Sequence, residues 1–180
     1  MNYQDLVGSI RDNLAQYRYT EPLETLSVDG ADGIVLATPR RRILMVRYLC
    51  GVLAVPDGYD TPEQARNLFE TIRSQLTRKY ARFPYWKELG TYLVLLSSNK
   101  LFLALQDRTG KFKDKTGFHM NVMLGTIFIN RENYVNSAEA TWGLFYSGRH
   151  FGAIAATVNE WCKRMRSEQG APADADKPRR

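Results

Sequence analysis

The strongest pattern in this sequence is a long amphipathic helix in the middle of the chain. Thr61, Pro62 and Gln64 form a typical helix start, because threonine can cap the first turn, proline is tolerated in it, and the glutamine completes a capping box. Pro84 predicts that the helix ends before it. The apolar residues between these limits recur at helical spacing: Ala65, Leu68, Phe69, Ile72, Leu76 and Tyr80.

Runs that are typical of strands stand on both sides of this helix. Three precede it and are joined by short turns, and the runs after it are separated by polar segments. We interpret Ser97-Ser98-Asn99-Lys100 as a hairpin or a tight connection between two strands. Residues 138–146 fit a strand or a helix. The predicted strands are 23–28, 33–38, 43–55, 91–96, 101–106 and 118–130.

Both ends of the chain carry a further helical pattern. Residues 149–165 predict a C-terminal helix, and residues 2–18 predict a short N-terminal one. We therefore expect an α+β fold, with a single curved antiparallel sheet, a central helix, a C-terminal helix and a short N-terminal amphipathic helix. The expected units are an N-terminal segment at 1–20, a globular domain at 21–166 and a disordered tail at 167–180.

Composition limits the partners of such a domain. At 180 residues, with 44% hydrophobic and 12% aromatic residues, the chain can build one real core. The net charge of +6 favours partners that carry phosphate, which include nucleic acid and an anionic membrane surface. The sequence has no long apolar run and no signal-peptide pattern, so we expect a protein that is neither secreted nor membrane-spanning.

No pattern in the sequence predicts an enzyme. The two histidines, His119 and His150, stand in no recognisable catalytic motif, and Cys50 and Cys162 lie in apolar runs that suit reduced core thiols. Cysteine and histidine are not clustered at the short spacing of a zinc site. We therefore predict no catalytic activity, no metal and no cofactor.

Basic residues gather in three places, and we predict that they form a polyanion-binding surface for lipid or nucleocapsid. Aromatic residues interleave with basic ones between Tyr80 and Lys87. Such a pattern can indicate base stacking on single-stranded nucleic acid. Because it lies at a helix-to-strand corner, we favour a core or protein interface instead. The predicted polyanion-binding residues are Arg40, Arg41, Arg42, Arg78, Lys79, Arg82, Lys111, Lys113 and Lys115.

The order of segments from Ile43 to Met165 resembles the globular domain of rhabdovirus matrix proteins. The segments that carry the resemblance are colinear with that family rather than specific one by one. They are Ile43 to Val55, Asp60-Thr61-Pro62, Arg82-Phe83-Pro84-Tyr85-Trp86-Lys87, Leu96-Ser97-Ser98-Asn99, Gly125-Thr126-Ile127 and Glu139-Ala140-Thr141-Trp142. The chain lacks the Pro-Pro-x-Tyr motif and lysine-rich arm of animal-virus members, and looks more like the compact form of plant-infecting members.

This resemblance implies a structural protein of the virion that lies beneath the envelope. Its partners would be the ribonucleoprotein or nucleocapsid, the anionic inner leaflet of the membrane, an envelope glycoprotein tail and further copies of itself. It would condense the nucleocapsid and drive budding, and in the host it would occur in the cytoplasm, at the membrane periphery and in the nucleus. The alternatives are a cellular nucleic-acid-binding protein and a small chaperone or adaptor.

Self-association would use the N-terminal segment. An isolated helix of this length is marginal in water, so its apolar stripe needs a surface to cover it. That surface is either the protein's own or that of a neighbouring copy, and the resemblance favours the neighbour. The stripe consists of Leu6, Val7, Ile10, Leu14 and Tyr17.

Overall fold

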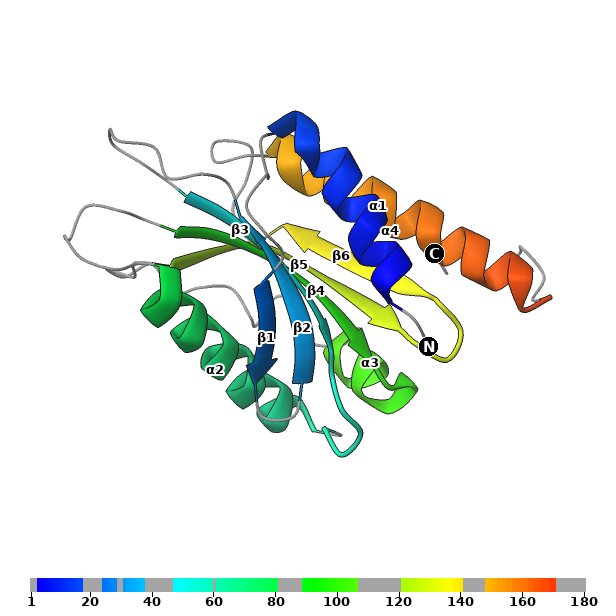
Figure 1. Ribbon diagram of the computed structural model, residues 1–180. Helices are drawn as coiled ribbons and strands as arrows, with labels where there is room; N and C mark the ends of the chain where they lie inside the picture. Colours follow the sequence, from blue (N-terminus) through cyan, green and yellow to red (C-terminus); the bar gives the residue numbers. More distant parts are fainter. Residues whose placement is uncertain are drawn as a thin grey trace.

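The fold is given by a computed structural model, which describes residues 3–17, 24–28, 31–37, 47–59, 61–80, 89–106, 121–140 and 148–170. Within these ranges the chain forms both strands and helices (Figure 1). In chain order the elements are α1 (Gln4–Leu14), the short 3₁₀ helix η1 (Ala15–Tyr17), β1 (Glu24–Val28), β2 (Ala31–Ala37), β3 (Arg47–Ala54), α2 (Pro62–Tyr80), β4 (Leu89–Ser97), α3 (Asn99–Gln106), β5 (Asn121–Asn130), β6 (Asn136–Ala140) and α4 (Gly148–Glu168).

The strands form one six-stranded sheet in the order β1-β2-β3-β4-β5-β6. The outer pairs β1–β2, β2–β3 and β5–β6 are antiparallel, whereas β3–β4 and β4–β5 are parallel. The α+β class is therefore confirmed, but the prediction of an antiparallel sheet is wrong for its centre. Parallel neighbours need a long crossover instead of a tight turn, and α2 and α3 are parts of the two crossovers.

The run at 101–106 is helix α3 and not the predicted strand. Ser98 starts this helix, because its Oγ accepts a hydrogen bond from the backbone N–H of Leu101 at 3.4 Å and its carbonyl accepts one from the N–H of Phe102 at 2.9 Å. Leu101, Phe102 and Leu105 lie on one face and are buried. A short apolar run fits a strand or a buried helix equally well, which explains the error.

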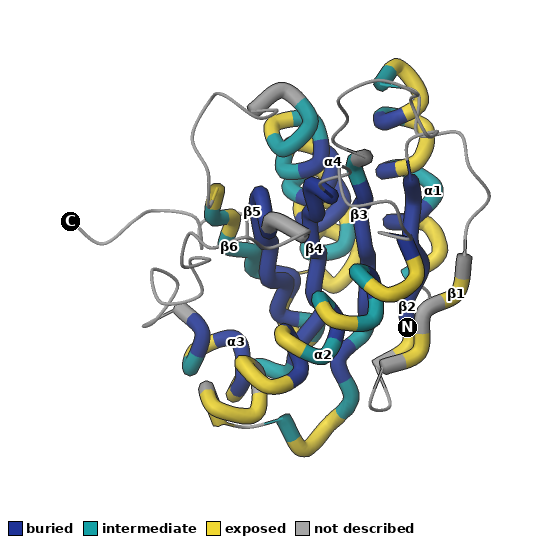
Figure 2. The backbone as a smooth tube through the Cα atoms, turned by 90° about the vertical axis from the view of Figure 1, so that its left-hand side faces the viewer, coloured by how far each residue is buried: buried dark blue, intermediate teal, exposed yellow. Residues whose placement is uncertain are grey.

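The sheet is the middle of three layers. On one face, α2 and α3 pack in a core that includes Leu53, Leu76 and Leu93. On the other face, α1 and α4 pack in a second core that includes Val52, Val94 and Val158. Figures 1 and 2 show the two helical layers on either side of the sheet, with buried strands between helices whose outer faces are exposed.

Helix α2 begins and ends where the sequence predicts. The backbone N–H of Thr61 donates to the side-chain oxygen of Gln64 at 3.0 Å, and the backbone N–H of Gln64 donates to the Thr61 hydroxyl at 3.3 Å. The capping box is thus confirmed. The helix ends at Tyr80, ahead of Pro84, so its exposed basic residues Arg78 and Lys79 lie in the last turn.

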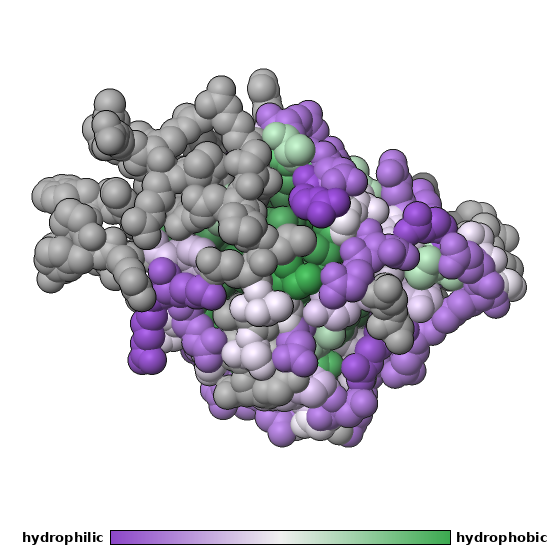
Figure 3. Space-filling view, in the orientation of Figure 1, coloured by the Kyte–Doolittle hydropathy of each residue, from purple (hydrophilic) through white to green (hydrophobic). Residues whose placement is uncertain are grey.

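Helix α1 belongs to the core of its own chain. Leu6, Ile10 and Leu14 are 0% exposed and lie against residues of α4 and the sheet. Asn13 strengthens this contact, because its Nδ2 donates to the Thr157 hydroxyl at 2.7 Å and to the Ala153 carbonyl at 3.2 Å. The outer surface of α1 and α4 is mostly hydrophilic (Figure 3).

This packing corrects the predicted self-association surface. Leu6, Val7, Ile10 and Leu14 are buried, and Tyr17 is half-buried against the same core, so the stripe is covered within the chain and is not available to a neighbouring copy in this fold. The reason is that α4 presents a matching apolar face alongside α1. Self-association through another surface stays a prediction.

The predicted division of the chain changes in two places. Residues 3–17 pack on the globular domain instead of standing apart from it as part of a 1–20 segment. Helix α4 continues to Glu168, so the first two residues of the tail predicted at 167–180 are helical. Residues 171–180 lie outside the described residues.

Candidate functional site

The two ends of the sheet differ, and we name them by the three parallel strands. At the amino end, β3, β4 and β5 begin. The pairing registers put the start of β1 and the ends of β2 and β6 at this same end, since Ala37 pairs with Leu49 and Ala140 pairs with Gly125. Helix α2 also finishes here, at the left of Figure 1. Four connecting segments therefore start and finish at the amino end, and a fifth, 107–120, joins the end of α3 to the start of β5 at that end.

These five segments are strongly basic. Residues 18–23, 38–46, 81–88, 107–120 and 141–147 together hold ten Lys and Arg against four Asp and Glu. The segments that join the described elements at the carboxyl end are 29–30, 55–61, 98 and 131–135, and they hold one Arg against four Asp and Glu. The topology thus gathers positive charge toward one end of the sheet and negative charge toward the other.

Two of the nine predicted polyanion-binding residues lie in the part of the chain that the structure describes. Arg78 and Lys79 are exposed at the amino end, and the Lys79 ammonium lies 5.8 Å from the ring centroid of Tyr80. The other seven lie outside the described residues, as does the 81–88 corner with its interleaved aromatic and basic residues. They are Arg40, Arg41, Arg42, Arg82, Lys111, Lys113 and Lys115. Their connecting segments all reach the amino end.

A cluster of aromatic rings lies at the same end, on the face that carries α1 and α4. The His150 ring is 4.5 Å from that of Tyr17 and 4.8 Å from that of Tyr48, measured between ring centroids. Tyr92 lies beneath them at 1% exposure, 6.5 Å from Tyr48 and 6.2 Å from Phe151. Tyr17, Tyr48 and His150 are each half-buried, and their rings pack against one another.

Two glycines in the sheet make room for this cluster. A Cβ at Gly90 would lie 3.0 Å from the Tyr48 ring, and a Cβ at Gly125 would lie 2.4 Å from the ring of Phe151. The second distance is far shorter than any ordinary contact, so a side chain at Gly125 would force Phe151 to move. The backbone thus fits the aromatic rings closely.

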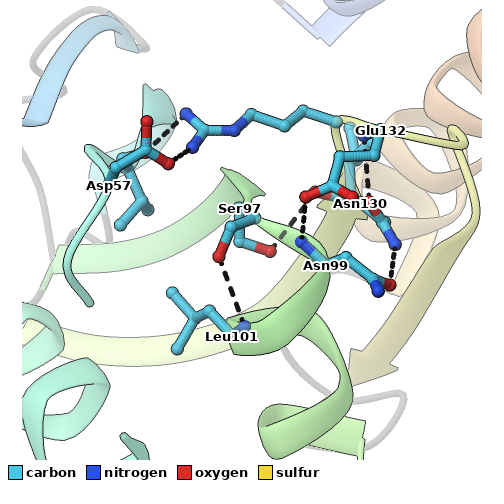
Figure 4. A network of polar contacts seen from close by, with 10 residues as sticks. Asp57, Ser97, Asn99, Leu101, Asn130 and Glu132 are labelled. Atoms are coloured by element: carbon cyan, nitrogen blue, oxygen red, sulfur yellow. Dashed lines mark hydrogen bonds and ion pairs between the residues drawn. The ribbon is translucent and has the colours of Figure 1, made fainter. Parts of the chain in front are cut away.

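The carboxyl end carries a network of polar contacts (Figure 4). Arg131 forms an ion pair with Asp57 and donates to the Val55 carbonyl at 3.2 Å. Asn130, which is 1% exposed, donates to the Asn99 side chain at 2.7 Å. Glu132 accepts a hydrogen bond from the backbone N–H of Asn99 at 3.0 Å, at the start of α3. The polar groups of this network satisfy one another, so the network is typical of structural support.

The histidines and cysteines that could take part in catalysis differ in burial. Burial lowers the pKa of His150 within the aromatic cluster, and His119 lies outside the described residues. Burial raises the pKa of the Cys50 thiol to about 12 and that of Cys162 to about 11. Both thiols are therefore protonated at neutral pH and are poor nucleophiles. The absence of catalytic activity stays a prediction.

Within the described part of the chain, no group of three or more histidine, cysteine, aspartate or glutamate residues could hold a metal ion. The described helices include none that is long and apolar enough to cross a membrane.

Sequence reasoning found the basic segments but missed the aromatic cluster. Tyr48 begins a strand, Tyr17 ends a helix and His150 lies in the first turn of another, so no local pattern joins them. The one available signal was an aromatic residue at the start of β3, Tyr48, and a glycine at the start of β4, Gly90, which indicates a close approach to the backbone. Comparison with family models, curated proteins and solved structures gives no match.

Proposed function

We propose that this protein is a non-enzymatic binding protein that holds a phosphate-bearing partner at the amino end of its sheet. The observation that supports this proposal is the charge contrast between the two ends. Ten Lys and Arg against four Asp and Glu stand in the segments that reach the amino end, and one against four stand in the segments at the carboxyl end. The net charge of the whole chain is +6.

The physical reason is the short range of charge interactions in salt solution. The Debye length is about 8 Å at physiological ionic strength, so scattered cations act singly whereas gathered ones act together on a polyanion. Cations that gather at one end can each displace a counterion from nucleic acid or attract an anionic membrane surface. A molecule of this kind binds by one end and leaves the other free.

The specific form of this proposal is a viral matrix protein. Such a protein bridges the ribonucleoprotein to the inner leaflet of the envelope, assembles with itself, and drives condensation and budding. The colinear resemblance from Ile43 to Met165 supports this form, and so does a basic end that suits both anionic partners. The same charge contrast supports a cellular nucleic-acid-binding protein, which would bind RNA or DNA but not lipid.

The test is a binding assay on the purified full chain at several salt concentrations. Fluorescence anisotropy measures binding to a labelled RNA, and flotation measures binding to liposomes that contain phosphatidylserine. Each basic cluster is neutralised in turn, with R40Q/R41Q/R42Q, R78Q/K79Q/R82Q and K111Q/K113Q/K115Q. We expect each triple variant to stay folded and to bind about 100-fold more weakly, since each cation near an anionic surface contributes about 1 kcal/mol.

The outcomes separate the two forms of the proposal. Binding to both RNA and liposomes, lost together in the variants, supports the matrix protein. Binding to RNA alone supports the cellular nucleic-acid-binding protein. If all three variants bind both partners as the parent does, the proposed function is wrong.

A further inference from the structure

We propose that the tip of the β5–β6 hairpin, residues 130–135, is a latch that holds the second half of α4 and releases it by a local opening. In this opening the sheet, α2 and α3 stay folded, and Trp161 and Cys162 become accessible. The latch lies at the carboxyl end of the sheet, whereas the proposed partner binds at the amino end. The device therefore goes beyond the proposed function and does not depend on it.

Hydrogen bonds fix the tip to the strands and to α3. The backbone N–H of Arg131 donates to the Ser97 carbonyl at 3.0 Å, and its guanidinium donates to the Val55 carbonyl at 3.2 Å. The Asn130 side chain donates to that of Asn99 at 2.7 Å, at the start of α3 (Figure 4). The tip is therefore firmly attached to the exits of β3 and β4 and to the helical layer that contains α3.

The attachment of the tip to α4 is of a different kind. The Tyr134 ring lies 5.5 Å from the Trp161 ring, at an interplanar angle of 82°, and both side chains are buried. Among the described residues, no hydrogen bond joins the tip to α4. Within this part of the chain, packing and not hydrogen bonding therefore holds α4 against the tip.

The closed contact carries two costs. Tyr134 has a φ of 54°, in the left-handed region that a bulky residue rarely adopts, whereas the other described residues with positive φ are Gly58 and Gly170. The buried indole N–H of Trp161 finds no hydrogen-bond acceptor in the described part of the chain, and the neighbouring tyrosine ring is at most a weak one. Opening lets the N–H reach water and frees Tyr134 to leave the left-handed region. The closed latch is thus less stable than an ordinary contact between two rings.

The two halves of α4 differ in burial. In the first half, Ile154 and Val158 are buried in the second core. In the second half, Trp161 and Cys162 are buried, but residues 163–168 are exposed or half-buried. Segments that bury few residues open at a lower free energy than the core does. The second half of α4 is therefore the part that leaves when the latch opens.

The two native cysteines measure this opening in the unaltered full chain. Cys162 lies under the latch and Cys50 lies in β3 within the sheet, and both are 0% exposed. A thiol reagent labels each of them only when the structure around it opens. N-ethylmaleimide labelling at several urea concentrations is followed by mass spectrometry of the two peptides. Cys162 should be labelled at least about tenfold faster than Cys50, with a weaker dependence on urea, because a local opening exposes less surface than global unfolding.

Two neighbouring substitutions test which side of the tip opens, and circular dichroism confirms that both variants fold. Tyr134→Asn removes the ring but keeps a residue that tolerates the left-handed region. It destabilises the closed state and not the open one, so Cys162 labelling should be roughly 10- to 100-fold faster. Val135→Ala is the matched control, because Val135 packs against the first core, on the fixed side. This packing is kept when the latch opens, so Cys162 labelling should change less than about twofold. Labelling of Cys50 should be faster in both variants, since global unfolding loses both contacts.

Equal labelling rates of the two cysteines, with equal urea dependence, would overturn the latch, because Cys162 would then be exposed by global unfolding. An unchanged Cys162 rate in Tyr134→Asn would overturn it too, since the ring contact would survive the opening. So would equal acceleration by Val135→Ala and Tyr134→Asn, because the fixed side would then open as well. If Tyr134→Asn does not fold, the rates of the parent and of Val135→Ala still decide. None of these results bears on binding at the amino end, so the proposed function stands or fails separately.

Discussion

The two ends of the sheet differ in the length, charge and hydrogen bonding of the segments that connect their strands. At the carboxyl end, short connections hold a polar network in which Asn130, Asn99 and Glu132 satisfy one another. At the amino end, longer connections carry ten of the chain's 25 Lys and Arg residues, and the same end holds the cluster of Tyr17, Tyr48 and His150. This contrast supports the proposal that the carboxyl end stabilises the fold and the amino end binds a partner.

This contrast follows from the topology. Three parallel strands put all of their starts at one end of the sheet, so the crossovers and the antiparallel returns bring their charges to that end together. An antiparallel sheet would have divided the same basic segments between both ends. The parallel centre is thus the feature that turns three separate basic clusters into one candidate surface.

The largest expected effect concerns α1, which runs along the sheet between the two ends. Ile10 is 0% exposed, so Ile10→Ala should lower the free energy of unfolding by about 2–5 kcal/mol, through lost burial and the cavity left behind. The neighbouring Arg11 is exposed, and Arg11→Ala should change it by no more than about 0.5 kcal/mol. Urea denaturation measures both. Equal small effects would mean that α1 is detachable and that its stripe is free for another copy.

The next effect compares basic pairs at opposite ends. Arg78 and Lys79 lie in the last turn of α2 at the amino end, whereas Lys163 and Arg164 are exposed on α4, beyond Trp161, whose ring contacts Tyr134 at the carboxyl end. The variant R78Q/K79Q should bind RNA roughly 30-fold more weakly, about 2 kcal/mol for two cations.

The matched variant K163Q/R164Q removes the same charge from the whole molecule and should retain nearly all of the affinity. Anisotropy at one fixed salt concentration checks both variants. If the two pairs lose affinity equally, net charge accounts for binding and its location does not matter.

A smaller effect tests the supporting role of the carboxyl end. Asn130→Ala removes the donor to Asn99 and the acceptor of the Glu132 backbone N–H, which lies 2.9 Å away. Because water can reach exposed Glu132, the loss should be about 1 kcal/mol of unfolding free energy, toward the low end for such groups. RNA affinity should stay unchanged. A variant with parental stability and weakened binding would reverse the roles of the two ends.

The smallest effect is a pH dependence at the amino end. Burial holds the pKa of His150 below its ordinary value of 6.5, so the folded protein favours the neutral ring. The contribution of His150 to the free energy of unfolding is fully present above pH 6.5. It decreases as the pH falls from 6.5 to the lower pKa of the folded state. His150→Phe should flatten this part of the stability curve measured by urea denaturation between pH 5 and pH 8. An unchanged curve would place the ring in a more solvated site.

The sequence predicts the elements with strong patterns. The helix from Thr61 carries its own start signal and one apolar face, and both describe the structure well. The first three strands and the C-terminal helix also follow from periodicity. These features depend on neighbouring residues, which a sequence displays directly.

The sequence does not predict features that depend on distant residues. The run at 101–106 is too short to choose between strand and helix, and that choice decides whether β4 and β5 are antiparallel or parallel. The stripe of α1 needed a cover, but only packing identifies that cover as α4 and the sheet. The aromatic cluster joins Tyr17, Tyr48 and His150 across most of the chain, and no local signal unites them.

The most direct test of the central claim is a hydrogen-exchange footprint of the full chain with and without saturating RNA at low salt. If the amino end binds, added protection should fall in peptides that cover 38–46, 81–88 and 107–120, and peptides that cover 55–61 and 131–135 should exchange as before. Protection concentrated at 55–61 and 131–135, or spread evenly over both ends, would contradict the account.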